Sequence, residues 1–87
     1  MKLGAHIYSK VITHAGNEIY FKHRENTPLH NLMHAFCSRL AVPMNSVSFR
    51  FDGDRINETH TPKQLGMEDG EIIDVHALTY FSAMVLG

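Results

Sequence analysis

Histidine offers the most chemistry in this 87-residue sequence, where it occurs seven times. His30 and His34 are four positions apart, so in a helix both imidazoles would lie on one face, as they do in HExxH metal sites. Asn31 follows His30, so the catalytic glutamate of that motif is missing. A third ligand would have to come from elsewhere in the chain, with His23 as the candidate. We therefore expect an exposed polar helix face and no metal site.

The single cysteine, Cys37, excludes both an internal disulfide and a zinc site built on cysteines. It falls among regularly spaced apolar residues, which indicates a small buried side chain rather than a nucleophile. No Ser-His-Asp arrangement, phosphate-binding loop or pair of catalytic carboxylates can be assembled from the sequence. We predict that the protein is not an enzyme and needs no cofactor.

Composition narrows the class of protein further. The length predicts one small domain, and a hydrophobic fraction of 44% with a charged fraction of 20% is typical of globular chains. The net charge of −1 argues against a surface built for nucleic acid. The longest apolar run is far shorter than the roughly 20 residues of a membrane span, and no signal peptide is visible. We expect no membrane association and a reducing, intracellular location.

The elements that would position these residues can be read from hydrophobic periodicity. Residues 5–12 and 18–24 flank a glycine-containing turn, which predicts a β-hairpin. A helix should follow, with Asn26 or Thr27 as its cap and Pro28 in its first position, and Pro43 should stop it. Six apolar residues at helical spacing would form its buried stripe: Leu29, Leu32, Met33, Phe36, Cys37 and Leu40.

The second half of the chain predicts three more strands. Residues 47–51 alternate, with Val47, Phe49 and Phe51 inward and Ser48 outward. A tight turn and a short strand at 55–56 follow, and then a loop with one helical turn whose apolar residues reach the core. Residues 71–77 form the last strand. The order β-β-α-β-β-β with one amphipathic helix predicts an α+β, β-grasp fold over residues 5–78, with tails at 1–4 and 79–87.

Three segments carry a family resemblance. VPMNSVSFRFDGDRI (42–56), HTPKQLGMEDGEIIDV (60–75) and LMHAFCSR (32–39) resemble the small ubiquitin-related modifier, SUMO, most of all its plant-type members. The resemblance implies a ubiquitin-like fold and a place in the sumoylation pathway, in the nucleus and cytoplasm. Members of this family are attached to target lysines through a C-terminal Gly-Gly. They also bind SUMO-interaction-motif peptides without a covalent bond.

The resemblance implies two interaction surfaces. The first is a peptide groove, in which a β-strand of the partner adds to an open strand edge. Its residues would be Tyr20, Phe21, Lys22, His23, Arg24, Leu32, Phe36 and Arg39. The second surface would contact the basic helix of the conjugating enzyme. Its residues would be Asp52, Gly53, Arg55, Glu68, Asp69 and Glu71. Ordinary edge-strand residues and a solvated turn are the plainer interpretations of these two sets.

The sequence departs from the family in its tails. No Gly-Gly occurs in the chain, and Phe81 and Ser82 stand where the two glycines are expected. Glycine permits the close backbone approach that activation needs, so we expect conjugation to be blocked. The resemblance implies a long polar arm before the first strand, and the residues before Ala5 here are MKLG. Residues 79–86 are largely apolar, so we expect them to fold back on the domain or to form a homodimer by adding to a second copy.

Three functional hypotheses remain. The first is a SUMO-like module that recognises peptides and the conjugating enzyme without becoming conjugated. The alternative is a genuine SUMO modifier whose C-terminus is altered in this form of the chain. The third, from another class, is a small enzyme or metal protein built on the histidines.

Overall fold

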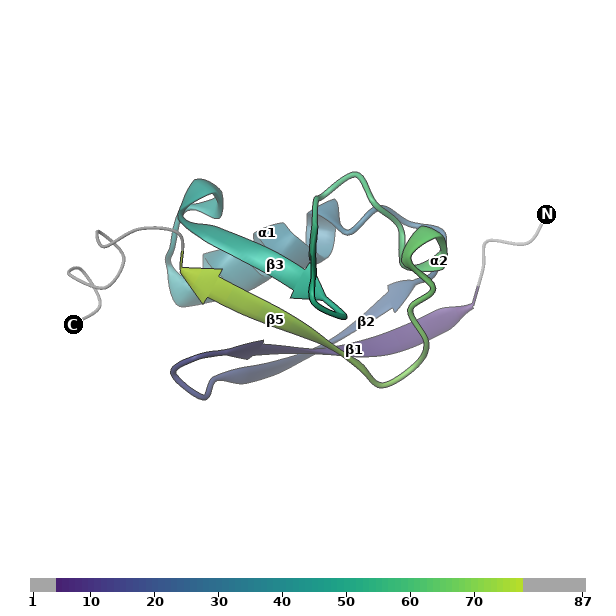
Figure 1. Ribbon diagram of the computed structural model, residues 1–87, viewed down its shortest axis with the longest axis horizontal. Coiled ribbons are helices and arrows are strands. Elements are labelled where there is room, and N and C mark those ends of the chain that lie inside the picture. Colours follow the sequence, from purple (N-terminus) through teal and green to yellow (C-terminus); the bar gives the residue numbers. More distant parts are fainter. Residues whose placement is uncertain (1–4, 78–87) are drawn as a thin grey trace.

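The computed structural model describes residues 5–77 (Figure 1). In chain order the elements are β1 (His6–Thr13), β2 (Glu18–Arg24), α1 (His30–Leu40), the 3-10 turn η1 (Met44–Ser46), β3 (Val47–Phe51), β4 (Asp54–Ile56), α2 (Pro62–Leu65) and β5 (Glu71–Ala77). This order confirms the predicted β-grasp arrangement. Neither α1 nor α2 has the length and apolar character to cross a bilayer.

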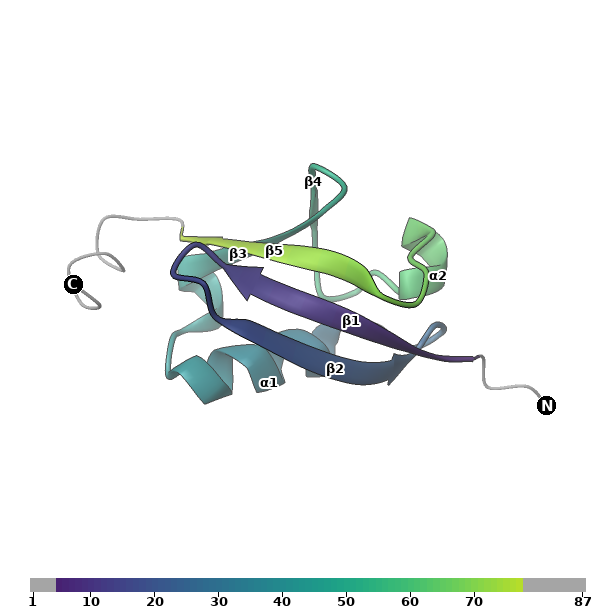
Figure 2. The same cartoon turned by 90° about the horizontal axis from the view of Figure 1, so that it is seen from below.

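The five strands form one mixed sheet in the order β2-β1-β5-β3-β4. β1 and β5 run parallel at its centre, and the other neighbours are antiparallel. Helix α1 packs against one face of this sheet (Figure 2). The sheet order leaves β2 and β4 as its two edges, so β2 offers an unpaired backbone edge beside α1.

The core forms between α1 and the facing side of the sheet. Phe36 is fully buried, and its ring meets Phe49 edge-on at 5.8 Å between centroids. The predicted stripe of α1 is buried except for Leu40, which is half-buried at the helix end. The remaining buried apolar residues are Ile7, Val11, Ile56, Met67, Ile73 and Val75.

The predicted start of α1 was wrong. Neither Asn26 nor Thr27 caps the helix, which begins at His30 with Leu29 in the capping position and no side-chain cap. The backbone of Thr27 instead donates to the carbonyl of Arg24 in a turn. Leu29 N–H donates at 2.9 Å to the carbonyl of His60, so a distant loop holds the residue directly before the helix.

Ser48 precedes the core residue Phe49 in β3, so strand alternation assigns its side chain to the opposite face of the sheet. The residue is nevertheless buried, with 3% of its surface exposed. Its Oγ has no hydrogen-bond partner among the described residues. The helical turn in the 60–67 segment is confirmed as α2, where Thr61 and Gln64 form a reciprocal capping box.

Candidate functional site

The open edge strand β2 divides its residues between two faces. Phe21 and His23 pair with Ser9 and Ile7 of β1 and lie on the side that faces α1. Tyr20 lies on the outer face and is 63% exposed. The ammonium of Lys10 makes a cation–π contact with its ring. The five consecutive residues assigned to the peptide groove therefore do not form one surface of side chains. They share instead the backbone edge to which a strand can add.

A groove of about 450 Å³ lies between β2 and the start of α1. It unites four of the eight residues assigned to the peptide site, namely Lys22, His23, Arg24 and Leu32, with five further residues. Sequence reasoning connected Asn31 with the groove, but it did not place the other four there: His6, Thr27, Pro28 and Leu29. Phe21 lies next to the groove, half-buried against the core.

Two other assigned groove residues lie elsewhere. Phe36 has no exposed surface, and it lines a separate apolar pocket of about 350 Å³ near the end of β5. Arg39 is exposed on the last turn of α1 and does not line the groove. The groove as folded is therefore centred on the first turn of α1, at the opposite end of the helix from Arg39.

His23 is the unusual residue of this groove. Its Nε2 shares a 2.8 Å hydrogen bond with Oγ of the fully buried Ser9, while its Nδ1 is buried with no partner among residues 5–77. Burial lowers the pKa of His23, because desolvation penalises the charged imidazolium. The groove therefore holds a neutral imidazole more readily than an ordinary surface position does.

The rim of the groove is positively charged. Lys22 and Arg24 both line it, and His6 joins them from β1. Desolvation, followed by the positive charges of Arg24 and then Lys22, lowers the pKa of His6. That influence indicates a positive local potential, which favours a partner with negative charge.

The six residues of the acidic surface come from the β3–β4 turn, strand β4, the turn before β5 and the first residue of β5. Asp52 and Gly53, with φ of 55° and 86°, form the tight turn between β3 and β4. Asp52 and Glu71 line one shallow groove of about 400 Å³ together with Asp74, which sequence reasoning missed. Asp74 is three positions from Glu71 along β5, so strand alternation assigns the two side chains to opposite faces and could not have paired them.

The other members of the acidic surface are exposed but have differing roles. Arg55 lies opposite Arg50 in the β3–β4 pair, and Glu68 precedes β5. Asp69 has a structural task, since its Oδ1 accepts a 2.7 Å hydrogen bond from the backbone N–H of Tyr8. Gly70 N–H donates to the carbonyl of the same tyrosine. These two bonds join the turn before β5 to strand β1.

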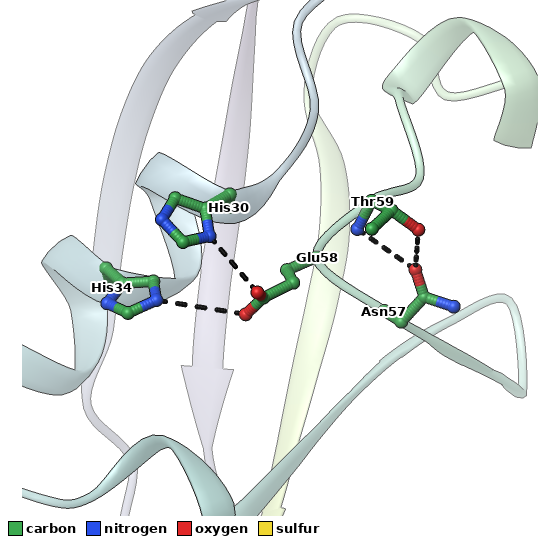
Figure 3. Close-up of polar contacts among 5 residues, drawn as sticks. All are labelled: His30, His34, Asn57, Glu58 and Thr59. Atoms are coloured by element: carbon green, nitrogen blue, oxygen red, sulfur yellow. Dashed lines mark hydrogen bonds and ion pairs between the residues drawn. The ribbon is translucent and has the colours of Figure 1, made fainter.

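His30 and His34 point from α1 toward Glu58, which lies in the loop after β4 (Figure 3). Their nearest carboxylate oxygens lie at 3.2 Å from His30 Nδ1 and 3.8 Å from His34 Nε2. The suggestion that His23 would supply a third donor was wrong, because His23 faces Ser9. Glu58 is 24 positions from His34 in sequence, and no local spacing could have identified it.

Comparisons with known proteins agree with this fold. Residues 9–76 match the family model described as "Ubiquitin-2 like Rad60 SUMO-like". The chain is 48% identical over 71 residues to Small ubiquitin-related modifier 2 of Arabidopsis thaliana, covering 82% of this chain and 69% of that protein. It is 50% identical over 70 residues to Small ubiquitin-related modifier 2 of Xenopus tropicalis, covering 80% and 74%.

Solved structures with similar folds are a SUMO and a ubiquitin. The solution structure of SUMO from Trypanosoma brucei superimposes with a TM-score of 0.75 at 39% identity, covering 86% of this chain and 74% of that one. A ubiquitin of Caldiarchaeum subterraneum has a TM-score of 0.78 at 18% identity, covering 86% and 96%. The second likeness is one of fold alone.

Proposed function

Because this chain belongs to the SUMO-like family of ubiquitin-fold proteins, we propose that it is a recognition module of the sumoylation pathway that binds SUMO-interaction-motif peptides non-covalently. Its relatives are protein modifiers, and the chain is not an enzyme. The observation that carries the proposal is the open edge of β2 beside a basic groove. Like its family, the protein would act in the nucleus and cytoplasm.

The backbone of β2 would supply most of the binding energy. β2 pairs with β1 on one side only, so a peptide in the extended conformation can add to its free side. Alternate side chains of such a peptide point to the same face. Those that face α1 would contact His23 and Leu32, which line the groove, and Phe21, which lies next to it.

The charges of the groove would select the flanking residues of the peptide. Lys22 and Arg24 on the rim favour an acidic flank, which increases the rate of encounter more than the final affinity. His23 introduces a polar ring where the family has a small apolar residue, and Asn31 replaces a family lysine. Both replacements should weaken binding relative to other members.

The second proposed contact is with the conjugating enzyme. Asp52, Glu71 and the neighbouring Asp74 line one groove on the outer side of the β3–β4 turn, away from the peptide groove. An acidic groove of this kind suits a basic helix, since opposite charges steer the two proteins together. The two surfaces do not overlap, so both partners could be bound at once.

The alternative function is covalent modification of target lysines. It is favoured by the relatives, which are named as modifiers. Phe81 and Ser82 decide whether conjugation is possible, and both lie outside the described residues. The whole 79–87 tail, on which the homodimer prediction depends, lies outside them as well. Incubation with activating enzyme and ATP separates the two functions, because only a modifier forms a thioester with the conjugating enzyme.

Titration with a peptide followed by NMR tests the non-covalent function. A peptide with a Val-Ile-x-Val core and an acidic flank should shift the amide signals of β2 and the first turn of α1, with a Kd of about 10–100 μM. A matched peptide with each core aliphatic replaced by serine should cause no shifts. Shifts confined to surfaces away from residues 20–24 would overturn the proposal.

A further inference from the structure

We propose that His30, His34 and Glu58 form a binding site for one divalent transition-metal ion of the Zn²⁺ class. The site is separate from the peptide groove and from the acidic surface. These are the residues in the described part of the chain whose donor atoms converge, all lying within 4.8 Å of one another. Sequence reasoning expected no metal here because it lacked the third donor, which the fold supplies.

The two imidazoles are aligned by helix geometry. Residues four positions apart stack on one face of an α-helix, and both positions fall in the first half of α1. The ring centroids of His30 and His34 are 4.1 Å apart, with a tilt of 39°. Their side chains are 51% and 50% exposed, so an ion can reach them from solvent.

The loop that carries Glu58 is held in place by its neighbours (Figure 3). On one side, Asn57 Oδ1 accepts hydrogen bonds from both the backbone N–H and the hydroxyl of Thr59, at 3.0 and 2.6 Å. On the other, Asn57 N–H donates to Nδ1 of His60 at 3.1 Å. The His60 carbonyl in turn receives the N–H of Leu29, directly before α1. The loop is thus tied to the start of the helix, and little chain entropy remains to be lost on binding.

The separations fit the coordination sphere of zinc. With metal–ligand bonds of about 2.0–2.1 Å, the ligands of a tetrahedral ion lie about 3.3 Å apart. The observed separations, 3.2 Å from His30 Nδ1 to Oε1 of Glu58 and 3.8 Å from His34 Nε2 to Oε2 of the same carboxylate, are close to that value. Two imidazoles and one carboxylate are a donor set that zinc uses, and the fourth position would hold water.

A metal ion would bind the same ring nitrogens that contact Glu58. The contacts of Glu58 are ion pairs only while the imidazoles are protonated, whereas neutral imidazoles can offer lone pairs from Nδ1 of His30 and Nε2 of His34. Protons and metal compete for these nitrogens, so the proposed binding weakens in acid.

The site lies on the side of α1 away from the peptide groove. Glu58 follows β4, one edge of the sheet, and the peptide groove adjoins β2, the other edge. A bound ion would fasten the start of α1 to the loop after β4 without covering the groove. Metal binding and peptide binding can therefore be measured independently.

Calorimetric titration of the full chain with Zn²⁺ at neutral pH tests the site. We expect one ion per chain, a raised melting temperature, and NMR shifts centred on His30, His34 and Glu58. His34→Ala should weaken binding at least tenfold, and Glu58→Gln should weaken it several-fold while preserving size. With Co²⁺ as the probe, the visible absorption bands of a tetrahedral site should appear and should be lost in His34→Ala.

His14→Ala is the matched control. His14 and His76 form the other close histidine pair, with 3.2 Å between Nε2 and Nδ1, but the described residues provide no third ligand beside them. Binding should be unchanged in this variant. Absence of stoichiometric binding, or binding lost in His14→Ala and retained in both His34→Ala and Glu58→Gln, would overturn the proposal. Circular dichroism of each variant verifies that loss of binding is not loss of fold.

Discussion

The imidazole of His23 shares a 2.8 Å hydrogen bond with the hydroxyl of Ser9, a residue with no exposed surface. This side-chain bond links β2, which lines the groove, to the neighbouring strand β1. One ring nitrogen is thereby engaged, while the other is buried without a partner among the described residues. The groove therefore contains a titratable group whose charged form is disfavoured by its surroundings.

The first prediction concerns pH. Because burial lowers the pKa of His23 in the fold, the unfolded chain binds more protons at mildly acidic pH. The stability contributed by the neutral ring is full above the unfolded pKa of about 6.5, and it is lost as pH falls through the lower folded pKa. Urea denaturation at a series of pH values measures how the free energy of unfolding falls with pH.

His23→Val should flatten the decline in stability between about pH 7 and 5. His14→Asn, which alters an exposed histidine outside the groove, serves as the control for general histidine effects. An unchanged decline in His23→Val would assign the pH dependence to the other histidines, including His6 beside Lys22 and Arg24.

The second prediction concerns the core. Phe49 is 3% exposed and meets the ring of Phe36 edge-on, so Phe49→Ala should lower the free energy of unfolding by about 3–5 kcal/mol. Ile72→Ala, at a 44% exposed strand position, should cost less than about 1 kcal/mol. Equal losses in chemical denaturation would contradict the assigned packing.

The third prediction concerns the charge of the groove. Lys22→Glu should weaken binding of an acidic-flanked peptide about fivefold, since one exposed ion pair is worth up to ~1 kcal/mol. Lys63→Glu makes the same charge change on α2, outside the groove, and should have little effect. The difference between the two variants should shrink at high salt, as isothermal titration at two ionic strengths can show.

The fourth prediction distinguishes an acidic-surface residue that stabilises the fold from one that does not. Asp69→Ala removes the acceptor of the Tyr8 N–H and should destabilise the fold by ~1 kcal/mol. Glu68→Ala, one position earlier, removes a carboxylate with no such bond and should leave the melting temperature nearly unchanged. If both variants melt alike, the Asp69 bond does not stabilise the join between β1 and the turn before β5.

The fifth prediction concerns conjugation. The chain as it stands should form no thioester with the conjugating enzyme, because Phe81 and Ser82 have side chains where glycines are required. Phe81→Gly with Ser82→Gly, in a chain ending at residue 82, should gain at least partial activation in an assay with activating enzyme and ATP. Thioester formation by the unaltered chain would instead support the genuine modifier.

Local patterns in the sequence were enough to determine the fold. Period-2 alternation identified β1, and the helical spacing from Leu32 to Leu40 identified α1, because burial on one face imposes that spacing on any amphipathic element. The family also followed from sequence, because long ordered segments match it and the matching residues include most of the buried ones.

Tertiary structure decided what depends on contacts between distant segments. The N–H of Leu29, directly before α1, bonds to the carbonyl of His60, and no local propensity contains that contact between distant segments. The pleat of β2 divided Tyr20 from Phe21, and burial removed Phe36 from the peptide surface. Glu58 reached His30 and His34 only because α1 packs beside the loop after β4. The sequence determines which residues share the buried face of a helix or strand. Packing between elements determines which side chains from distant segments come into contact.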